Sequence, residues 1–182
     1  MSAAEPLIDV RQLLKTYTVE QLNQTADDYF QQYDTPELVG KLLSKPFINP
    51  RETPHLLVSF SHALQGLQLA KDMTVLDFGA GPCWSSRALT QLGYKVIACD
   101  VSEAALTLAR KGFELFPTQG PHHKPTFLLF DGHKLDLPDA SVDRVFCLDA
   151  FHHVPNQEEV LRELARVLKP GGVAGFSEPG PD

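Results

Sequence analysis

The sequence of 182 residues predicts an α/β fold in which a doubly wound parallel sheet follows an N-terminal helical cap. Apolar residues recur at helical spacing up to residue 72, and beyond it short β-rich runs alternate with helical patterns. These β-rich runs are apolar on both faces, as expected for strands that helices cover from both sides. We therefore expect a cap at residues 1–72 and an α/β domain at residues 73–182.

The N-terminal part carries two marked helix starts. Thr18, followed three residues later by Gln21, predicts a capping box, and Thr35 before Pro36 predicts an N-cap with proline in the first turn. Two prolines within residues 45–50 predict a loop. A further helix is predicted by apolar residues at helical spacing, namely Leu56, Leu57, Phe60, Leu64 and Leu67.

The C-terminal part is predicted to contain five strands with helices between some of them. We expect the strands at residues 74–78, 95–100, 126–130, 144–148 and 173–177. We expect the helices at residues 84–92, 103–115 and 157–169, the last capped by Asn156 with Glu159 and ended by residues 169–172. Right-handed crossovers make the strands parallel, and ligands then bind at their carboxyl ends.

Residues 75–84 read as a strand that runs into a glycine turn and then a helix. Gly79 and Gly81 allow a sharp turn and leave room for a ligand against the backbone, although a purely structural turn is the alternative. The dinucleotide pattern G-x-G-x-x-G requires a third glycine where this chain has Trp84, which disfavours an NAD-linked enzyme. Asp77, just before the turn, suits a cationic or amine-bearing ligand.

Two further strand ends carry carboxylates. Asp100 follows the glycine turn at about the 20-residue spacing at which an acidic residue meets ribose hydroxyls, which predicts a nucleoside site. The alternative is that Asp100 or Ser102 only caps the helix that follows. At the third strand end, Asp131 can accept a hydrogen bond from an adenine amine while the backbone of Gly132 approaches the ring, or both residues simply form a turn.

Together with the segments Leu-Asp-Ala-Phe-His-His at 148–153 and Leu-Lys-Pro-Gly-Gly at 168–172, these features resemble the class I S-adenosylmethionine-dependent methyltransferases over residues 73–178. The resemblance implies a Rossmann-like fold with S-adenosyl-L-methionine as cofactor. It also implies the cofactor contacts. Asp77, Gly79 and Gly81 would line the methionine part, and Asp100 would hold the ribose hydroxyls. Asp131 and Gly132 would meet the adenine, and Leu148 and Asp149 would lie beside the sulfonium end.

The chain departs from the family pattern in two places. Cys83 stands where the family often has a third glycine. The family fold has seven strands, whereas five are found here, so we expect the last two strands of that fold to be lacking. The sheet would then keep an open edge, which is a hazard for association, and we expect a homo-oligomer through this edge.

Methyl transfer from a sulfonium is an in-line displacement that depends mainly on alignment, and an oxygen or nitrogen acceptor also needs a base. His152 and His153, just past the fourth strand, are the candidate bases, with a packed structural pair as the alternative. The aromatic residues Tyr29, Phe30 and Tyr33 either close over the cofactor or form core. His122-His123 lacks a third ligand nearby in the sequence, so no metal site is expected.

Composition excludes several other functions. A net charge of −7 without a basic cluster disfavours nucleic acid, and no apolar run approaches the roughly 18 residues that span a membrane. Three cysteines without a C-x-x-C pair indicate a reduced, cytoplasmic protein. The sequence thus predicts a methyltransferase acting on a small-molecule or conjugate acceptor. A non-catalytic nucleoside-binding or scaffolding domain of the same fold remains the alternative.

Overall fold

The computed structural model describes residues 12, 14–119 and 124–180, and within them five strands form one sheet. The strand order is β3-β2-β1-β4-β5, and every neighbouring pair is parallel, which confirms the predicted doubly wound sheet. The strands are β1 (Thr74–Phe78), β2 (Lys95–Asp100), β3 (Thr126–Leu129), β4 (Val142–Leu148) and β5 (Leu168–Ser177). The order reverses between β1 and β4, and ligands bind at such a switch point.

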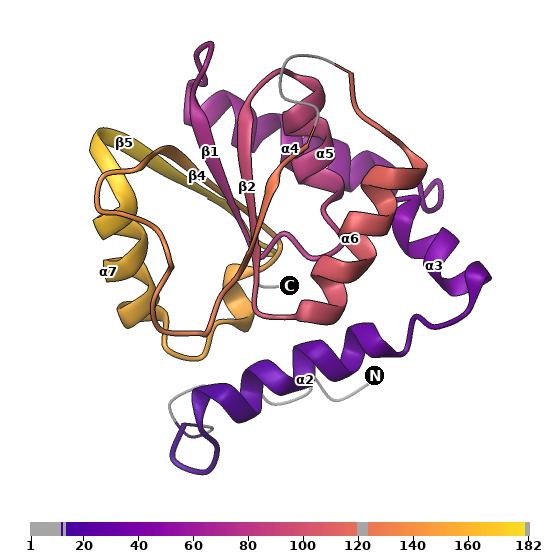
Figure 1. Cartoon of the computed structure of the whole chain (residues 1–182), viewed down its shortest axis with the longest axis horizontal. Coiled ribbons are helices and arrows are strands. Elements are labelled where there is room, and N and C mark those ends of the chain that lie inside the picture. The colour runs from indigo at the N-terminus through magenta and orange to yellow at the C-terminus, as the bar shows by residue number, and fades with distance from the viewer. Residues whose placement is uncertain (1–11, 13, 120–123, 181–182) are drawn as a thin grey trace.

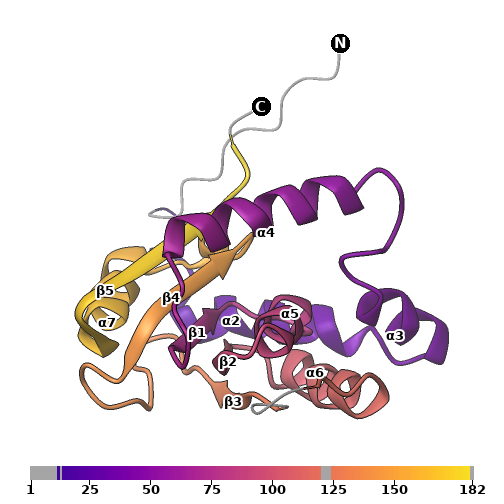
Figure 2. The ribbon, with the colours of Figure 1, turned by 90° about the horizontal axis from the view of Figure 1, so that it is seen from above.

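Helices cover both faces of this sheet, as Figures 1 and 2 show. The helices are α2 (Val19–Gln31), α3 (Pro36–Leu43), α4 (Thr53–Leu67), α5 (Trp84–Gln91), α6 (Glu103–Leu115) and α7 (Gln157–Val167), with a 3₁₀ turn at Phe151–His153. On one face Phe60 of α4 and Leu89 of α5 pack on Val75 and Phe146, and on the other Leu164 of α7 packs on Val145. This alternation follows from the two-residue period of the strands.

The predicted helix starts in the N-terminal part are confirmed. The Thr18 hydroxyl accepts from the Gln21 amide at 3.3 Å and the Gln21 side chain accepts from the Thr18 amide at 2.9 Å, which completes the capping box. The Thr35 hydroxyl accepts from the Leu38 amide at 3.3 Å. The prediction for Asn156 is wrong in one respect: it occupies the N-cap position of α7, but its side chain makes no capping hydrogen bond.

Strand β5 begins earlier than predicted. It includes residues 168–172, which were expected to form the end of the preceding helix, and α7 therefore stops at Val167. Proline removes a backbone donor, but Pro170 is tolerated because β5 pairs only with β4 among the described residues. Leu168 pairs with Val142, and the register shifts before Val173 pairs with Arg144. None of the helices in the described ranges is long and apolar enough to cross a bilayer.

Helix α2 lies across the end of the sheet at which the glycine turn sits (Figure 1). Asp27 of α2 fixes it there, because its Oδ1 accepts from the Ser102 hydroxyl and the Ala104 amide, both at 2.8 Å, at the start of α6. A carboxylate at this position satisfies free amides of the first turn of α6 and opposes the positive end of its dipole. Helix α2 thereby closes one side of the carboxyl edge of the sheet.

Candidate cofactor and active site

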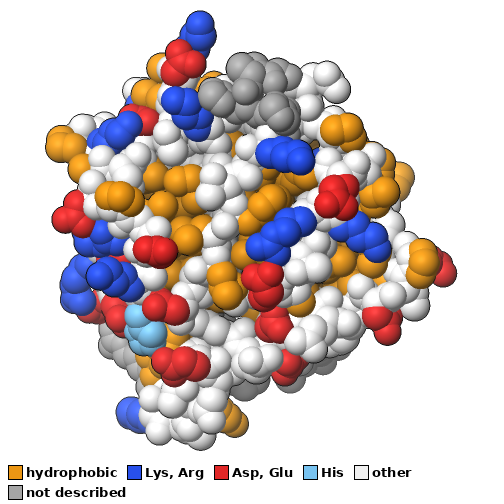
Figure 3. Space-filling model, in the orientation of Figure 1, with side chains coloured by type: hydrophobic (Ala, Val, Ile, Leu, Met, Phe, Trp, Pro, Cys, Tyr) orange, Lys and Arg blue, Asp and Glu red, His pale blue; other side chains and the backbone are white. Residues whose placement is uncertain are grey.

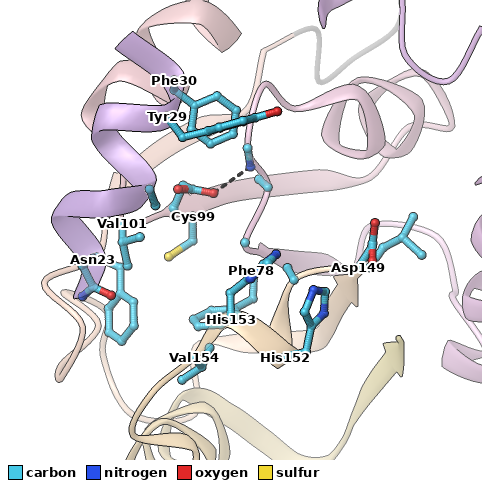
Figure 4. Close-up of a pocket in the computed structure, with 18 of the residues that line it drawn as sticks. Asn23, Tyr29, Phe30, Phe78, Cys99, Val101, Asp149, His152, His153 and Val154 are labelled. Carbon is cyan, nitrogen blue, oxygen red and sulfur yellow. Dashed lines mark hydrogen bonds between the residues drawn. The ribbon is translucent and has the colours of Figure 1, made fainter. Parts of the chain in front are cut away.

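A cavity of about 740 Å³ lies at the carboxyl ends of β1, β2 and β4 and is also lined by residues of α2. This volume is in the range of small-molecule sites. Figure 4 shows side chains from α2 and from the segments after these strands around the same space. Six of the eight predicted cofactor residues line it: Gly79, Gly81, Asp100, Gly132, Leu148 and Asp149.

The glycine turn brings the segments after β1 and β4 into contact. Gly79 and Gly81 have φ angles of +69° and +52°, in the left-handed region that favours glycine. A Cβ atom on Gly79 would lie 2.4 Å from the Cβ of Ala150, so no side chain fits there. Cys83, at the expected third glycine position, also takes a left-handed φ of +64° and is wholly buried.

Asp100 connects the two sequence elements from which a nucleoside site was predicted. Its Oδ2 accepts from the Gly81 amide at 2.7 Å, drawn as a dashed line in Figure 4, and its Oδ1 accepts from the Ser102 amide at 2.9 Å. Desolvation raises the pKa of Asp100 above its usual range and outweighs the effect of these amides. The predicted cap of α6 is also present, because the Ser102 hydroxyl accepts from the Ala105 amide at 3.0 Å.

Asp77 does not lie in the cavity, which corrects the contact expected for it. Its side chain is 1% exposed and points to the face that α5 covers, where its Oδ2 accepts from the hydroxyls of Ser85 and Ser86. The reason is the pleat, since alternate residues of β1 face opposite sides of the sheet. Desolvation raises the pKa of Asp77 to about 6, against the opposing effect of the two serines.

Asp131 is likewise absent from the cavity lining. It is exposed, and its Oδ1 accepts from the amides of His133 and Lys134, both at 2.7 Å, so the turn that was the alternative interpretation is present. Gly132 does line the cavity. It has a φ of +98°, and a Cβ atom there would lie 2.3 Å from the Nδ2 atom of Asn23.

Two amide side chains that the sequence did not single out as site residues line the same end of the cavity. The Nδ2 atom of Asn23 and the Oδ1 atom of Asn156 are buried without a hydrogen-bond partner in the described part of the chain. Asn156 uses its Nδ2 atom to donate to the Gly132 carbonyl at 2.9 Å. No sequence signal marks Asn23, because one asparagine on an amphipathic helix is an ordinary surface residue.

The aromatic residues of α2 divide between cavity and packing. Tyr29 and Phe30 line the cavity, as expected for residues that close over a cofactor, and Tyr33 bonds the Tyr29 hydroxyl at 2.8 Å from outside the lining. Trp84 has both roles, since it lines the cavity and packs on Phe60 with 5.3 Å between ring centroids.

The two candidate bases both line the cavity, and their rings lie 3.9 Å apart between centroids (Figure 4). The Nδ1 atom of His152 lies 2.6 Å from the Oε2 atom of Glu178, a residue that sequence analysis missed. Burial lowers the pKa of His153, and His152 beside it acts in the same direction. His122-His123 lies outside the described residues, within which no cluster of metal-ligating side chains occurs.

Residues 76–176 match the family model of a methyltransferase domain, which is more than half of the chain. The chain belongs to the class I S-adenosylmethionine-dependent methyltransferase family. Family membership and the parallel sheet confirm the expected fold class and S-adenosylmethionine as the cofactor.

Individual relatives of the chain are named as methyltransferases. The chain is 38% identical over 115 residues to the sarcosine/dimethylglycine N-methyltransferase of Halorhodospira halochloris, covering 62% of this chain and 39% of the relative. It is 35% identical over 121 residues to the 2-methyl-6-phytyl-1,4-hydroquinone methyltransferase of Synechocystis sp., covering 64% and 36%. The solved structure of an S-adenosylmethionine-dependent methyltransferase from Aquifex aeolicus matches with a TM-score of 0.56 at 26% identity, covering 79% and 68%. The chain spans less than half the length of these two curated relatives.

The residues that line the cavity fit S-adenosylmethionine. Each Asp100 oxygen accepts one backbone hydrogen bond and keeps capacity for another, which suits a ribose diol. The unpartnered Nδ2 donor of Asn23 and Oδ1 acceptor of Asn156 complement the N1 acceptor and the amine donor of adenine. The glycine turn borders the same cavity, and at Gly79 its backbone lies so close to Ala150 that a side chain would clash.

Proposed function

We propose that this methyltransferase binds S-adenosylmethionine in the cavity beneath α2 and transfers its methyl group to a small-molecule or soluble conjugate acceptor. The single observation that carries the proposal is the Asp100 carboxylate, which bonds the Gly81 amide and is 8% exposed at the cavity wall. A carboxylate held by fixed amides is preorganised to accept from two vicinal hydroxyls.

Each part of the cofactor then has its own contacts. Asp100 holds the ribose hydroxyls, Gly132 with Asn23 and Asn156 surrounds the adenine, and the glycine turn supports the methionine part. The sulfonium end lies beside Leu148 and Asp149. The bound cofactor supplies an electrophilic methyl group on a positively charged sulfur. The protein's main contribution is to align that group with the acceptor and to exclude water.

The acceptor enters from the side of Asp149 in this proposal. A second cavity of about 460 Å³ shares Lys45, Leu56 and Asp149 with the first and adds Arg51, Glu52 and His55, so the two spaces adjoin. His152 or His153 takes the proton that a protonated acceptor must lose. The relatives are named for an amine and for a hydroquinone acceptor, which supports small molecules as the class.

Calorimetric titration with S-adenosylmethionine tests the binding site. Asp100→Ala removes the ribose acceptor and leaves the Gly81 amide unpaired, so we expect an affinity loss of about 1.5–3 kcal/mol. Asp136→Ala, at an exposed carboxylate, is the matched control and should leave the affinity unchanged. Equal affinity of the Asp100→Ala variant and the wild type would refute the assigned contact, and tight NAD binding in place of S-adenosylmethionine would reverse the assignment.

Turnover is tested separately by mass-spectrometric detection of S-adenosylhomocysteine with candidate acceptors. Dimethylglycine and a methylated hydroquinone are the first probes, because relatives are named for them. Release above the acceptor-free rate supports the enzyme. Cofactor binding without release from a broad acceptor panel favours the non-catalytic nucleoside-binding domain, for which the five-stranded sheet is the supporting observation.

We retain a boundary at residue 72, with the helices before it as a cap on the α/β domain at residues 73–182. We place the protein in the cytoplasm, on the grounds of its unpaired cysteines in a reduced state. We also propose self-association through the edge of β5, and we propose no nucleic-acid partner because of the net charge of −7.

A further inference from the structure

Glu178, just after β5, holds the segment that carries the two candidate bases. Its Oε1 accepts from the amides of Phe151 at 2.9 Å and Ala150 at 3.2 Å. Its Oε2 accepts from the His152 amide at 3.3 Å and lies 2.6 Å from the Nδ1 atom of the same residue. One carboxylate thus fixes both the backbone of this segment and one of its imidazole rings.

The charge on Glu178 determines which nitrogen of His152 carries the proton. Desolvation opposes ionisation, but the hydrogen bonds from the His152 ring and from the amides of Phe151 and Ala150 hold the pKa of Glu178 below its usual value. An ionised carboxylate only accepts hydrogen bonds, so the Nδ1 atom of neutral His152 must be the donor. The Nε2 atom then bears the lone pair, and no described residue bonds it.

His153 lacks this arrangement. Both rings line the cavity, but no described residue hydrogen-bonds either ring nitrogen of His153, so neither tautomer is selected. Glu178 itself is not in the cavity lining, so it acts on the cavity through the lining residues that it bonds, which are Ala150 and His152. The adjacent histidines, which are equivalent in the sequence, therefore differ in the structure.

We infer that Glu178 is a positioning residue that fixes His152 in the tautomer whose Nε2 atom accepts the proton of the acceptor. The inference rests on the proposed methyl transfer, and it applies to acceptors whose attacking atom carries a proton. The proton passes to Nε2 of His152, its electron pair stays on the attacking atom and forms the new bond to the methyl carbon, and the carbon–sulfur electron pair returns to sulfur. The resulting imidazolium faces the Glu178 carboxylate, as in other carboxylate–histidine pairs.

The ring tautomers can be measured directly by long-range ¹H–¹⁵N correlation NMR on the unliganded protein, with His152→Gln used to assign the signals. In the wild type at neutral pH we expect His152 to carry its proton on Nδ1. Glu178→Gln should reverse this, because the amides of Phe151 and Ala150 retain the Gln oxygen and so turn its NH₂ group toward His152. Glu158→Gln, the same change at an exposed glutamate, should leave the signals as in the wild type.

Each result decides the inference. A switch of His152 from the Nδ1–H to the Nε2–H tautomer in Glu178→Gln supports it, and a merely structural role of Glu178 would not produce this switch. An Nε2–H tautomer of His152 in the wild type overturns it, even if the Glu178→Gln variant does not fold. An unchanged tautomer in a folded Glu178→Gln variant overturns it as well. Because the measurement uses neither cofactor nor acceptor, its failure would leave the proposed methyl transfer to be judged by calorimetry and turnover.

Discussion

At the scale of single residues, Asp77 shows a buried carboxylate whose role is structural. It lies behind the glycine turn and bonds the hydroxyls of Ser85 and Ser86 in the first turn of α5. A negative charge at a helix start is favourable, but complete burial costs more than two serine hydroxyls return, as the pKa of about 6 shows. Between pH 3.8 and about 6, Asp77 therefore holds a proton in the folded protein that it has released in the unfolded chain.

Asp77→Asn should remove a pH-dependent loss of stability. Between pH 3.8 and about 6 the folded state binds more protons at this residue than the unfolded state, so the contribution of Asp77 to the free energy of unfolding falls as pH rises. Relative to wild type, Asp77→Asn should gain about 2 kcal/mol between pH 4.5 and pH 7. Urea unfolding at both pH values measures the gain. Asp136→Asn is the control, and a pH-independent difference would contradict the burial argument.

The glycine turn allows a matched pair of substitutions. Gly79 and Gly93 both have positive φ angles, +69° and +94°, but only at Gly79 would a Cβ atom clash, at 2.4 Å from Ala150. Gly93→Ala should cost about 1–2 kcal/mol of unfolding free energy for the left-handed backbone alone. Gly79→Ala should cost a further 1–3 kcal/mol, roughly, for the forced displacement. Chemical denaturation measures both losses of unfolding free energy. Equal losses would show that Ala150 moves away from the new Cβ atom at no measurable cost.

At the scale of elements, α2 is held over the cavity at two points. Asp27 bonds the start of α6, and Glu20 lies 3.1 Å from the Nε2 atom of His133, whose Nδ1 atom lies 2.9 Å from Glu159 of α7. Figure 3 shows histidine surface bordered by acidic side chains on this face of the molecule. The hydrogen bonds from His133 to Glu159 and Glu20 raise its pKa, against some desolvation. Because the residue is partly exposed, the bridge is a weak tether.

The tether should loosen as pH rises. Protonated His133 donates to both carboxylates, so its contribution is present below its ordinary pKa and is lost above the raised value. Hydrogen exchange of α2 amides, corrected for intrinsic rates, should show roughly threefold greater protection at pH 6 than at pH 8. His133→Ala should abolish this difference, whereas His62→Ala, at an exposed histidine of α4, should preserve it. Protection that is equal at both pH values in the wild type would show that the His133 bridge does not hold α2.

The elements were predictable where one signal dominates. The capping box at Thr18, the proline at the start of α3 and the runs of β1 and β2 all depend on local sequence, and the structure has them. Long-range contacts carry no such local signal. The direction of Asp77 follows from the pleat of β1, but the sequence does not show which face of the sheet α5 covers. The contact of Glu178 with His152 could not be inferred from spacing, because it depends on the pairing of β4 with β5.

At the scale of the whole molecule, parallel pairing explains why distant carboxylates and glycines meet. Residue 79 directly follows β1, residues 100 and 148 are the last residues of β2 and β4, and these three strands are neighbours in the sheet. A sequence that alternates strands and helices therefore predicts a common site without predicting any side-chain contact within it. The amides of Asn23 and Asn156 complete the site from α2 and from the start of α7.

The edge strand β5 leads to a prediction about assembly. Among the described residues β5 pairs only with β4, so its other side presents free backbone donors and acceptors next to Val173 and Phe176, which are 38% and 39% exposed. Such an edge pairs readily with another chain, and lysine on an edge strand opposes this pairing. We expect sedimentation velocity of the 182-residue chain to show concentration-dependent dimers, and Val173→Lys to weaken the dimer at least tenfold. Leu161→Lys, on the exposed side of α7, should not change it. A monomeric wild type at 100 µM, roughly the range in which weak interfaces form, would show that this edge does not self-associate.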